Sequence, residues 1–374
     1  YELTQDGLVI SKGILSEFSV ASHGEGKTNL KISVPENGKC YLKLIYYLKK
    51  EMPLLEENHI LGFDEIEVSQ KDAKCQLAEK WLEKTATDSE LQVNEDDTQI
   101  HIKGREFAYT IDRRTALFTE MKFAGREYLN HPMELNIWRA PTDNDMYIKA
   151  EWKKAHYDKA YTRAYTTEVV QGKHGVKIVS HASVVAETVQ KILDVTITWK
   201  IDASGKIDAD IEATKDEEFP DLPRFGVRMF LDKKLSDARY FGMGPQESYR
   251  DKHQAASHGL YRANVRDLHE DYIRPQENGS HYDCGYVELN NSRYGMAAFS
   301  ESTFSFNASY YTQEELEKKT HNYELAESDS VVLCVDYALN GIGSNSCGPV
   351  VLDQYRFNDV LFRFQFTLVP YVKG

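Results

Sequence analysis

Short segments in which apolar and polar residues alternate recur along this chain, and they constrain its fold more than any other feature. Such alternation occurs in Leu30–Val34, Lys43–Leu48, Gln99–Lys103, Asp194–Trp199 and Lys206–Ile211. A period of two residues over about four to eight positions, rich in Val, Ile, Thr and Tyr, is typical of strands with one buried face. The pattern predicts a strand in each of these segments.

Turn-forming residues separate the alternating segments. Pro35–Gly38, Gln171–Gly175 and Asp202–Gly205 each combine Gly with Pro, Asn, Asp or Ser neighbours, or enclose a short polar stretch between two glycines. Strands and turns repeated in this way predict antiparallel sheets packed face to face. Because no regular alternation of strand and helix is visible, neither a TIM barrel nor a Rossmann sheet is expected within these residues.

Two segments predict short helices. Ile148–Tyr157 has the composition for two or three turns of helix. Thr312–Lys319 begins with Thr312 as a candidate N-cap and carries Glu315 three residues later, the pattern of a capping box. Neither segment is long enough to organise a domain, so the expected fold class is all-β.

A polar, weakly patterned stretch at Glu83–Glu90 predicts a domain boundary. We place the boundary between residues 85 and 86. Residues 1–85 have the size of a small sandwich with about six or seven strands. Residues 86–374 show no comparable break, so they are expected to form one large double-sheet antiparallel sandwich.

Charge and cysteine usage exclude several functional classes. The chain has 45 Lys+Arg against 59 Asp+Glu, a formal net charge of −14, and no basic block, so a nucleic-acid or anionic-membrane partner is not expected. No apolar run approaches the ~18–20 residues that span a bilayer. The five scattered cysteines lack disulfide or zinc-ligand spacing, which predicts reduced thiols, a cytoplasmic location and no metal site.

The chain opens at Tyr1, so we expect a processed protein or a piece of a longer one.

The first candidate site is the run Asn136–Asp145. It combines Arg139 with Asp143, Asn144 and Asp145 beside a proline. This composition suits a loop that binds a polar ligand, and it equally suits a turn in which Asp143 and Asn144 bond backbone amides. Arg139 is expected to hold the loop through a charge-assisted bond to Asp143 or Asp145.

The second candidate is the run Tyr240–Asp251, in which two glycines precede a proline and mark a strand that enters a sharp turn. No helix signal follows, so a phosphate-binding loop is not expected. Glu247, Arg250 and Asp251 either bind hydroxyl groups or pair with one another.

The third and fourth candidates are loops next to strands, where binding residues often lie. The run Arg274–Gly279 contains Glu277 and Asn278, and the run Gly341–Pro349 contains Ser344, Asn345 and Cys347. A nucleophilic Cys347 would need a base and an orienting group, and no pattern in the sequence points to them.

These four runs resemble, in the same order, the signature runs in the C-terminal region of bacterial glycoside hydrolase family 2 β-galactosidases of the lactase type. They read WRAPTDND, YFGMGPQESYRD, RPQENG and GIGSNSCGP. The segments YELTQDGLVISKGIL and HILGFDEIEVSQ resemble the sandwich domain that precedes this region. The resemblance implies an immunoglobulin-like β-sandwich in residues 1–85 and, in residues 86–374, an antiparallel β-supersandwich of the galactose-mutarotase-like fold.

The resemblance also implies a function. In that family the catalytic glutamates and the divalent-metal ligands belong to a TIM barrel, so no catalytic residue and no cofactor are expected in this chain. It is expected to be a non-catalytic part of an enzyme that hydrolyses terminal β-D-galactosides, inactive alone. Expected partners are the rest of the β-galactosidase chain or sister subunits and a carbohydrate substrate. The alternatives are an independent carbohydrate-binding module and an aldose-epimerase-like enzyme, and the latter requires a His/Glu acid–base pair for which no motif is visible.

In the family the terminal domain closes one side of the active-site mouth, and a mobile loop there resembles the segment from Met146 onward. Cys347 lies near the position of an aromatic residue that stacks on sugar in some members, and a thiol lacks the broad apolar face of an indole. Ser344 and Asn345 remain candidates for hydrogen bonds to a hydroxyl group. The full set of candidate mouth residues is Arg139, Asp143, Asn144, Asp145, Arg250, Glu277, Asn278, Ser344, Asn345 and Cys347.

Overall fold

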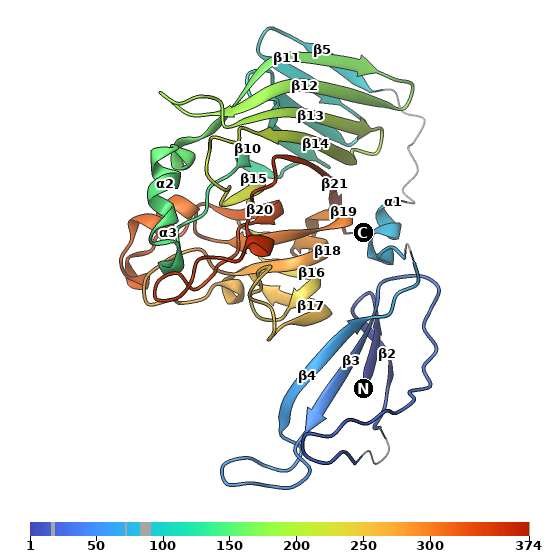
Figure 1. The fold of residues 1–374 in the computed structure, drawn as a ribbon. Coiled ribbons are helices and arrows are strands. Elements are labelled where there is room, and N and C mark those ends of the chain that lie inside the picture. Colours follow the sequence, from blue (N-terminus) through green and yellow to red (C-terminus); the bar gives the residue numbers. More distant parts are fainter. Residues whose placement is uncertain (16–18, 72, 83–90, 374) are drawn as a thin grey trace.

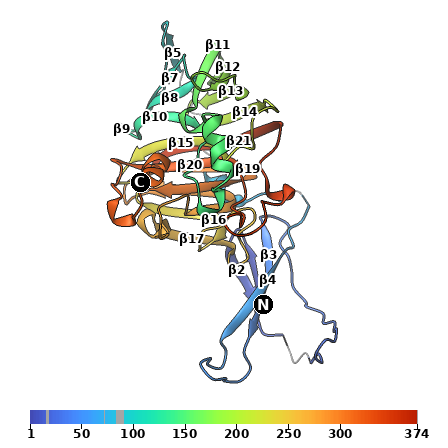
Figure 2. The same ribbon diagram turned by 60° about the vertical axis from the view of Figure 1, so that its left-hand side comes forward.

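The computed structural model describes residues 1–15, 19–71, 73–82 and 91–373. These residues form three antiparallel β-sheets of four, twelve and five strands. The few helices are short, so the predicted all-β class is confirmed. The small N-terminal sheet projects from one end of a larger body that contains the other two sheets (Figures 1 and 2).

The N-terminal sheet has the strand order β2-β1-β3-β4. Its strands are β1 (Glu2–Gln5), β2 (Leu8–Lys12), β3 (Cys40–Tyr47) and β4 (Ile60–Glu67). The described residues before 83 thus contain four strands, fewer than the six or seven expected. Helix α1 (Glu79–Leu82) follows, and the predicted boundary at residues 85/86 lies outside the described residues.

The strand predicted at Leu30–Val34 is wrong. Its alternation survives as a succession of half-buried and exposed side chains, but the segment has no regular secondary structure. Alternation indicates that one face of a segment is covered, whereas a strand also needs a backbone ladder with a neighbouring strand. No such neighbour exists for this segment among the described residues.

The large sheet has the order β10-β15-β20-β19-β21-β14-β13-β12-β11, with β16, β17 and β18 attached beside β19. Its strands are β10 (Leu129–Asn136), β11 (Tyr161–Gln171), β12 (Gly175–Val185), β13 (Leu193–Asp202), β14 (Ile207–Lys215), β15 (Arg224–Asp232), β16 (Asp237–Gly244), β17 (Ser257–Asn264), β18 (Ser280–Asn290), β19 (Tyr294–Ser309), β20 (Ser330–Leu339) and β21 (Leu361–Val372). The five-stranded sheet contains β5 (Gln92–Glu95), β6 (Gln99–Lys103), β7 (Phe107–Asp112), β8 (Leu117–Phe123) and β9 (Arg126–Glu127).

Four of the five strands predicted from alternation are confirmed, as β3, β6, β13 and β14. β13 and β14 alternate buried and more exposed side chains along their lengths, as a strand with one covered face requires. The predicted turn Asp202–Gly205 joins them, and Gly205 adopts φ +86°, a left-handed conformation that favours glycine.

The main core contains buried side chains of the five-stranded sheet and of β12–β14, which lie against one another in Figure 1, and it continues along β15 and β18–β21. Phe118 of β8 meets Trp199 of β13 edge to face, with ring centroids 4.9 Å apart. Trp199 is fully buried, and its indole N–H donates to the Ala116 carbonyl at 2.8 Å, so burial leaves no polar group unsatisfied there.

Both predicted helices are confirmed, as α2 (Ile148–Lys154) and α3 (Gln313–Lys318). The Thr312 hydroxyl caps α3 by accepting from the Glu315 amide at 3.1 Å. The Glu315 carboxylate accepts from the Ala326 amide at 2.8 Å, so it ties α3 to the following loop. Within the described ranges no helix is long and apolar enough to cross a membrane, and the five cysteines are free thiols.

The N-terminal sheet docks on β17 of the large sheet. Gly7, at φ +78°, approaches so closely that its carbonyl accepts from the Leu260 amide at 3.2 Å. A Cβ at this glycine would lie 2.2 Å from the Leu260 nitrogen, so no larger residue fits without a shift of the backbone. The tight turn between β1 and β2 is therefore part of the contact.

A buried histidine strengthens this contact. His258 of β17 bonds Glu65 of β4 through Nδ1 at 2.7 Å and Asp283 of β18 through Nε2 at 3.0 Å. Tyr41 of β3 stacks on its ring at 4.0 Å. Burial disfavours the charged imidazolium, but the bonds to the two carboxylates outweigh it and raise the pKa of His258 to about 9. At neutral pH a protonated imidazolium thus joins the two parts of the molecule.

We expect His258 to make the stability of the chain depend on pH. A histidine pKa raised to about 9 from an ordinary value of about 6.5 corresponds to about 3 kcal/mol of folding free energy. This contribution is complete below the ordinary pKa and is lost as the pH rises through about 9. Urea unfolding at several pH values should show wild type losing its advantage over His258→Asn in alkaline solution. Parallel pH curves for the two proteins would contradict this account, and the exposed His101→Asn is the matched control.

Candidate functional site

All four sequence runs meet at one pocket, which we call the motif pocket. It has a volume of about 440 Å³. Its lining residues are Thr142, Asp143 and Asn144 from the first run; Tyr249 and Asp251 from the second, with the adjoining Lys252; Gln276 and Glu277 from the third; Ile342, Gly343 and Ser346 from the fourth; and Tyr272. Residues 200 positions apart in the sequence thus share one cavity, whose size is typical of a ligand site.

The first run is held in shape by its own side chains. β10 ends at Asn136, whose amide group accepts from the Trp138 N–H at 3.0 Å and donates to the Trp138 carbonyl. The Asp145 carboxylate accepts from the Thr142 amide at 2.9 Å and from the Thr142 hydroxyl at 3.1 Å. The chain consequently turns through the short 3₁₀ segment Asp143–Asp145 before it enters α2.

Arg139 joins the first run to the fourth. Its guanidinium is fully buried and forms two bonds to Asp145, from Nε at 3.1 Å and from Nη2 at 2.7 Å. It also donates to the carbonyls of Asn340 at 2.5 Å and Gly341 at 3.1 Å. Of the two partners expected for Arg139, the one observed is Asp145. Both side chains are buried and do not line the motif pocket, but they hold together the loops that form its walls.

Asp143 and Asn144 line the motif pocket and bond to the other runs. The Asp143 amide donates to the Gln276 side chain at 3.0 Å, and the same side chain returns a bond to the Asp143 carboxylate at 3.2 Å. Asn144 donates to the Gly343 carbonyl at 2.7 Å and accepts from the Ser346 hydroxyl at 2.7 Å. The Asp143 side chain remains exposed, so it is free to meet a ligand as well.

The second run contributes two carboxylates that fix neighbouring loops. Asp251 accepts from the amides of Ile342 at 2.9 Å and Gly343 at 2.7 Å. Glu247 accepts from the Gly279 amide at 2.8 Å and from Tyr272 and Lys252. Among the described residues neither carboxylate pairs with Arg250. Asp251 ties the second run to the fourth, and Glu247 ties it to the third.

Glu277 of the third run lies at the floor of the motif pocket. Its carboxylate is 3.3 Å from the Arg224 guanidinium, and its amide donates to the Ala140 carbonyl at 3.0 Å. Burial raises the pKa of Glu277, against the opposing effect of Arg224 and Arg139. Arg224 also bonds Asp336 of β20 at 2.5 Å. Sequence reasoning missed Arg224 and Asp336, although Asp336 is the one charged residue in the apolar strand β20, which was an available signal.

The remaining candidates lie outside the motif pocket. Asn278 is buried, and its side chain bonds the backbone of Glu270 and Gln276. Ser344, Asn345 and Cys347 do not line the pocket, and the loop that carries them is closed by a bond from the Gly348 amide to the Ser344 carbonyl at 2.7 Å. Ser346 is the side chain of this loop that reaches the cavity.

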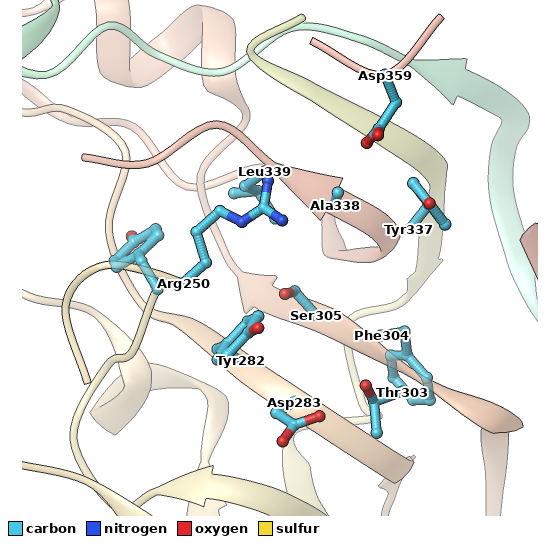
Figure 3. A pocket seen from close by; sticks show the side chains of 11 residues that line it. Arg250, Tyr282, Asp283, Thr303, Phe304, Ser305, Tyr337, Ala338, Leu339 and Asp359 are labelled. Carbon is cyan, nitrogen blue, oxygen red and sulfur yellow. The ribbon is translucent and has the colours of Figure 1, made fainter. Parts of the chain in front are cut away.

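Arg250 does not line the motif pocket, and its side chain instead lines a neighbouring cavity (Figure 3). Met146 and Tyr147, at the start of the segment expected to be a mobile loop, are exposed and lead directly into α2. Across the described parts of the chain, no group of three or more His, Cys, Asp or Glu side chains is arranged to hold a metal ion.

Residues 103–368 match the family described as beta galactosidase small chain. The chain belongs to this family. It is 41% identical over 371 residues to the β-galactosidase of Actinobacillus pleuropneumoniae and 32% identical over 326 residues to that of Staphylococcus xylosus.

The alignments cover 99% and 87% of this chain but only 36% and 32% of these two relatives, so the chain spans about a third of their length. Among solved structures, a galactose 1-epimerase from Lactobacillus acidophilus NCFM superposes with a TM-score of 0.42 at 7% identity, covering 78% of this chain and 100% of that one.

Asp143 and Asp145 provide a matched test of these assignments. Asp145→Asn removes the counter-charge of a fully buried guanidinium, so we expect a loss of about 3–5 kcal/mol in the free energy of unfolding. Asp143→Asn changes an exposed carboxylate and should cost less than about 1 kcal/mol. Urea denaturation of both variants measures the difference. Equal losses would show that Asp145 does not hold the loop as described.

Proposed function

We propose that this chain is the C-terminal, non-catalytic part of a β-galactosidase, and that its motif pocket forms one wall of the substrate mouth. Membership of the small chain family supports the first statement. The second statement is supported by the convergence of all four runs on one cavity. The substrate class that we propose, terminal β-D-galactosides, is the one for which these related β-galactosidases are named.

The chemistry of the motif pocket suits a substrate rich in hydroxyl groups. Asp143 offers an exposed carboxylate, and Lys252 and Tyr272 offer polar ends that bond each other at 2.7 Å. The bonds between the runs fix these groups before a substrate arrives. Such preorganisation reduces the entropy lost on binding, which is the contribution that a non-catalytic wall makes to turnover.

The carboxylates of the motif pocket are poorly placed to catalyse glycoside hydrolysis alone. That reaction needs two carboxyl groups free to flank the scissile bond. Asp251 uses both oxygens on backbone amides, and Glu277 faces Arg224. Asp143 alone is exposed. Because no histidine lines the described motif pocket, an epimerase with a His/Glu pair receives less support from this cavity.

The N-terminal sheet supports the proposal of a larger assembly. β2 exposes Leu8, Val9 and Ile10, and β4 exposes Ile60, Leu61 and Ile66, with exposed fractions from 44% to 59%. These strands are the two edges of the N-terminal sheet, and exposed apolar side chains gathered at an edge are candidates for contact with another protein surface. We assign these strands to contact with the rest of the β-galactosidase chain or with sister subunits.

A chimera tests the proposed function. This chain replaces the matching C-terminal 36% of the Actinobacillus pleuropneumoniae β-galactosidase, and hydrolysis of a chromogenic β-galactoside is measured. We expect the chimera to be active, and both the isolated chain and the relative truncated before this region to be inactive. Turnover by the isolated chain, or a folded but inactive chimera, would contradict the proposal.

Asp143→Ala in the chimera tests the role of the mouth. Loss of one charged hydrogen-bonding group should lower kcat/KM about tenfold while the melting temperature stays close to that of the unsubstituted chimera. Asp353→Ala is the matched control, because Asp353 is exposed and lines neither the motif pocket nor its neighbour. A fall in melting temperature without a fall in kcat/KM would make Asp143 purely structural.

A further inference from the structure

A second cavity adjoins the motif pocket, and Tyr249 lines both. We call it the Arg250 pocket (Figure 3). It has a volume of about 170 Å³ and lies where β18, β19 and β20 run side by side. Its lining residues are Tyr249, Arg250, Tyr282, Asp283, Thr303, Phe304, Ser305, Tyr337, Ala338, Leu339 and Asp359. The lining residues of this pocket that belong to β18, β19 and β20 take no part in the hydrogen bonds described above between the four runs.

An irregularity in β18 shapes this pocket. The pairing of β18 with β19 shifts between His281 and Cys284, and Asp283 adopts φ +52°, a left-handed conformation. Successive side chains of a regular strand point to opposite faces, and a bulge redirects one of them. Here both Tyr282 and Asp283 line the cavity. β-Bulges and residues with a left-handed backbone conformation occur more often near binding sites than elsewhere in proteins.

Asp283 presents a fixed carboxylate to the Arg250 pocket. Burial alone raises the pKa of Asp283, but the bonds from His258 and Thr303 outweigh it and hold that pKa below its usual value. His258 Nε2 lies 3.0 Å from Asp283 Oδ2 and is itself anchored to Glu65. The carboxylate is therefore ionised at neutral pH and cannot rotate freely.

Arg250 and Asp359 complete the polar lining. Arg250 donates from Nη1 to the Arg356 carbonyl at 3.1 Å, and its other N–H donors have no hydrogen-bond partner among the described residues. Figure 3 shows its guanidinium beside Ala338 and Leu339 and the Asp359 carboxylate directed toward the same space. Asp359 is exposed and forms no hydrogen bond with the described residues. Both groups are available to a ligand.

The charged side chains of the Arg250 pocket favour a neutral ligand that carries several hydroxyl groups. Sugar hydroxyls donate to carboxylates and accept from guanidinium N–H groups, so neighbouring hydroxyls can satisfy Arg250 and Asp283 together. One cationic and two anionic side chains leave a net charge of −1, which disfavours phosphates and carboxylates. A volume of about 170 Å³ has room for about five or six waters, which suits one sugar ring and not two.

We propose that the Arg250 pocket binds a neutral monosaccharide, at a site separate from the motif pocket. The proposal concerns this chain alone and does not rest on its role in a β-galactosidase. Tyr282 and Tyr337 offer rings against which the apolar face of a sugar packs, and Ser305 offers a further hydroxyl.

Titration of the full chain with D-galactose and D-glucose, followed by calorimetry and by ligand-observed NMR, tests the proposal. We expect saturable binding with a dissociation constant on the order of 1 mM for at least one of the two sugars. Arg250→Gln and Asp359→Asn should each weaken binding about tenfold. Asp359 is exposed and forms no hydrogen bond with the described residues, so its variant should keep the fold. Asp353→Asn, at an exposed residue that lines neither pocket, should leave the affinity unchanged.

Three results would overturn the proposal. The first is the absence of binding by the correctly folded wild-type chain at tens of millimolar sugar. The second is binding that Asp143→Asn abolishes and Asp359→Asn spares, which would place the sugar in the motif pocket. The third is binding of spermidine in preference to either sugar, with loss at high salt, which would make the cavity a cation site. An inactive chimera together with intact sugar binding would contradict the proposed function and leave this site standing.

Discussion

The fully buried guanidinium of Arg139 is the interaction on which the arrangement of the motif pocket depends. A charged group removed from water is tolerated only where its donors and its charge are matched. Arg139 meets this condition with the Asp145 carboxylate and the carbonyls of Asn340 and Gly341. Because a planar guanidinium presents its donors in a fixed geometry, it sets the distance between two loops 200 residues apart.

The other bonds between the runs build on that one. With the chain at Gly341 fixed, the amides of Ile342 and Gly343 face the Asp251 carboxylate, and the Gly343 carbonyl meets Asn144. The third run joins through the Glu277 amide and the Ala140 carbonyl. Each bond uses a backbone group that a loop would otherwise leave unsatisfied, so the walls of the cavity are rigid although they are built from loops.

The sequence predicted strands best where the burial of one face alone determines the pattern of apolar and polar residues. Alternation predicted β6 residue by residue and most of β13 and β14, because each of these strands covers one face of a core. It failed at Leu30–Val34, where a half-covered face exists without a neighbouring strand. A period of two indicates that one face of a segment is buried. The backbone hydrogen bonds that make the segment a strand depend on residues elsewhere in the chain.

The candidate site was predicted as four separate runs because turn formers mixed with polar groups stand out in a strand-rich chain. Their meeting at one cavity could not be predicted, since it depends on contacts between distant loops. Arg139 and Asp145 were chosen as candidate mouth residues, but both are buried and neither lines the motif pocket. Arg224 and Asp336 were missed, because a charged residue in one strand does not indicate which residue of another strand pairs with it.

Hydrogen exchange at the amides of Ile342 and Gly343 tests the central role of Arg139 most directly. Arg139→Lys keeps the charge but cannot reach all three acceptors at once. Loss of these bonds should raise the exchange rates of the two amides about tenfold or more, while the amides of β12 and β13 keep theirs. Unchanged protection at Ile342 and Gly343, or a uniform loss across the whole chain, would contradict the account.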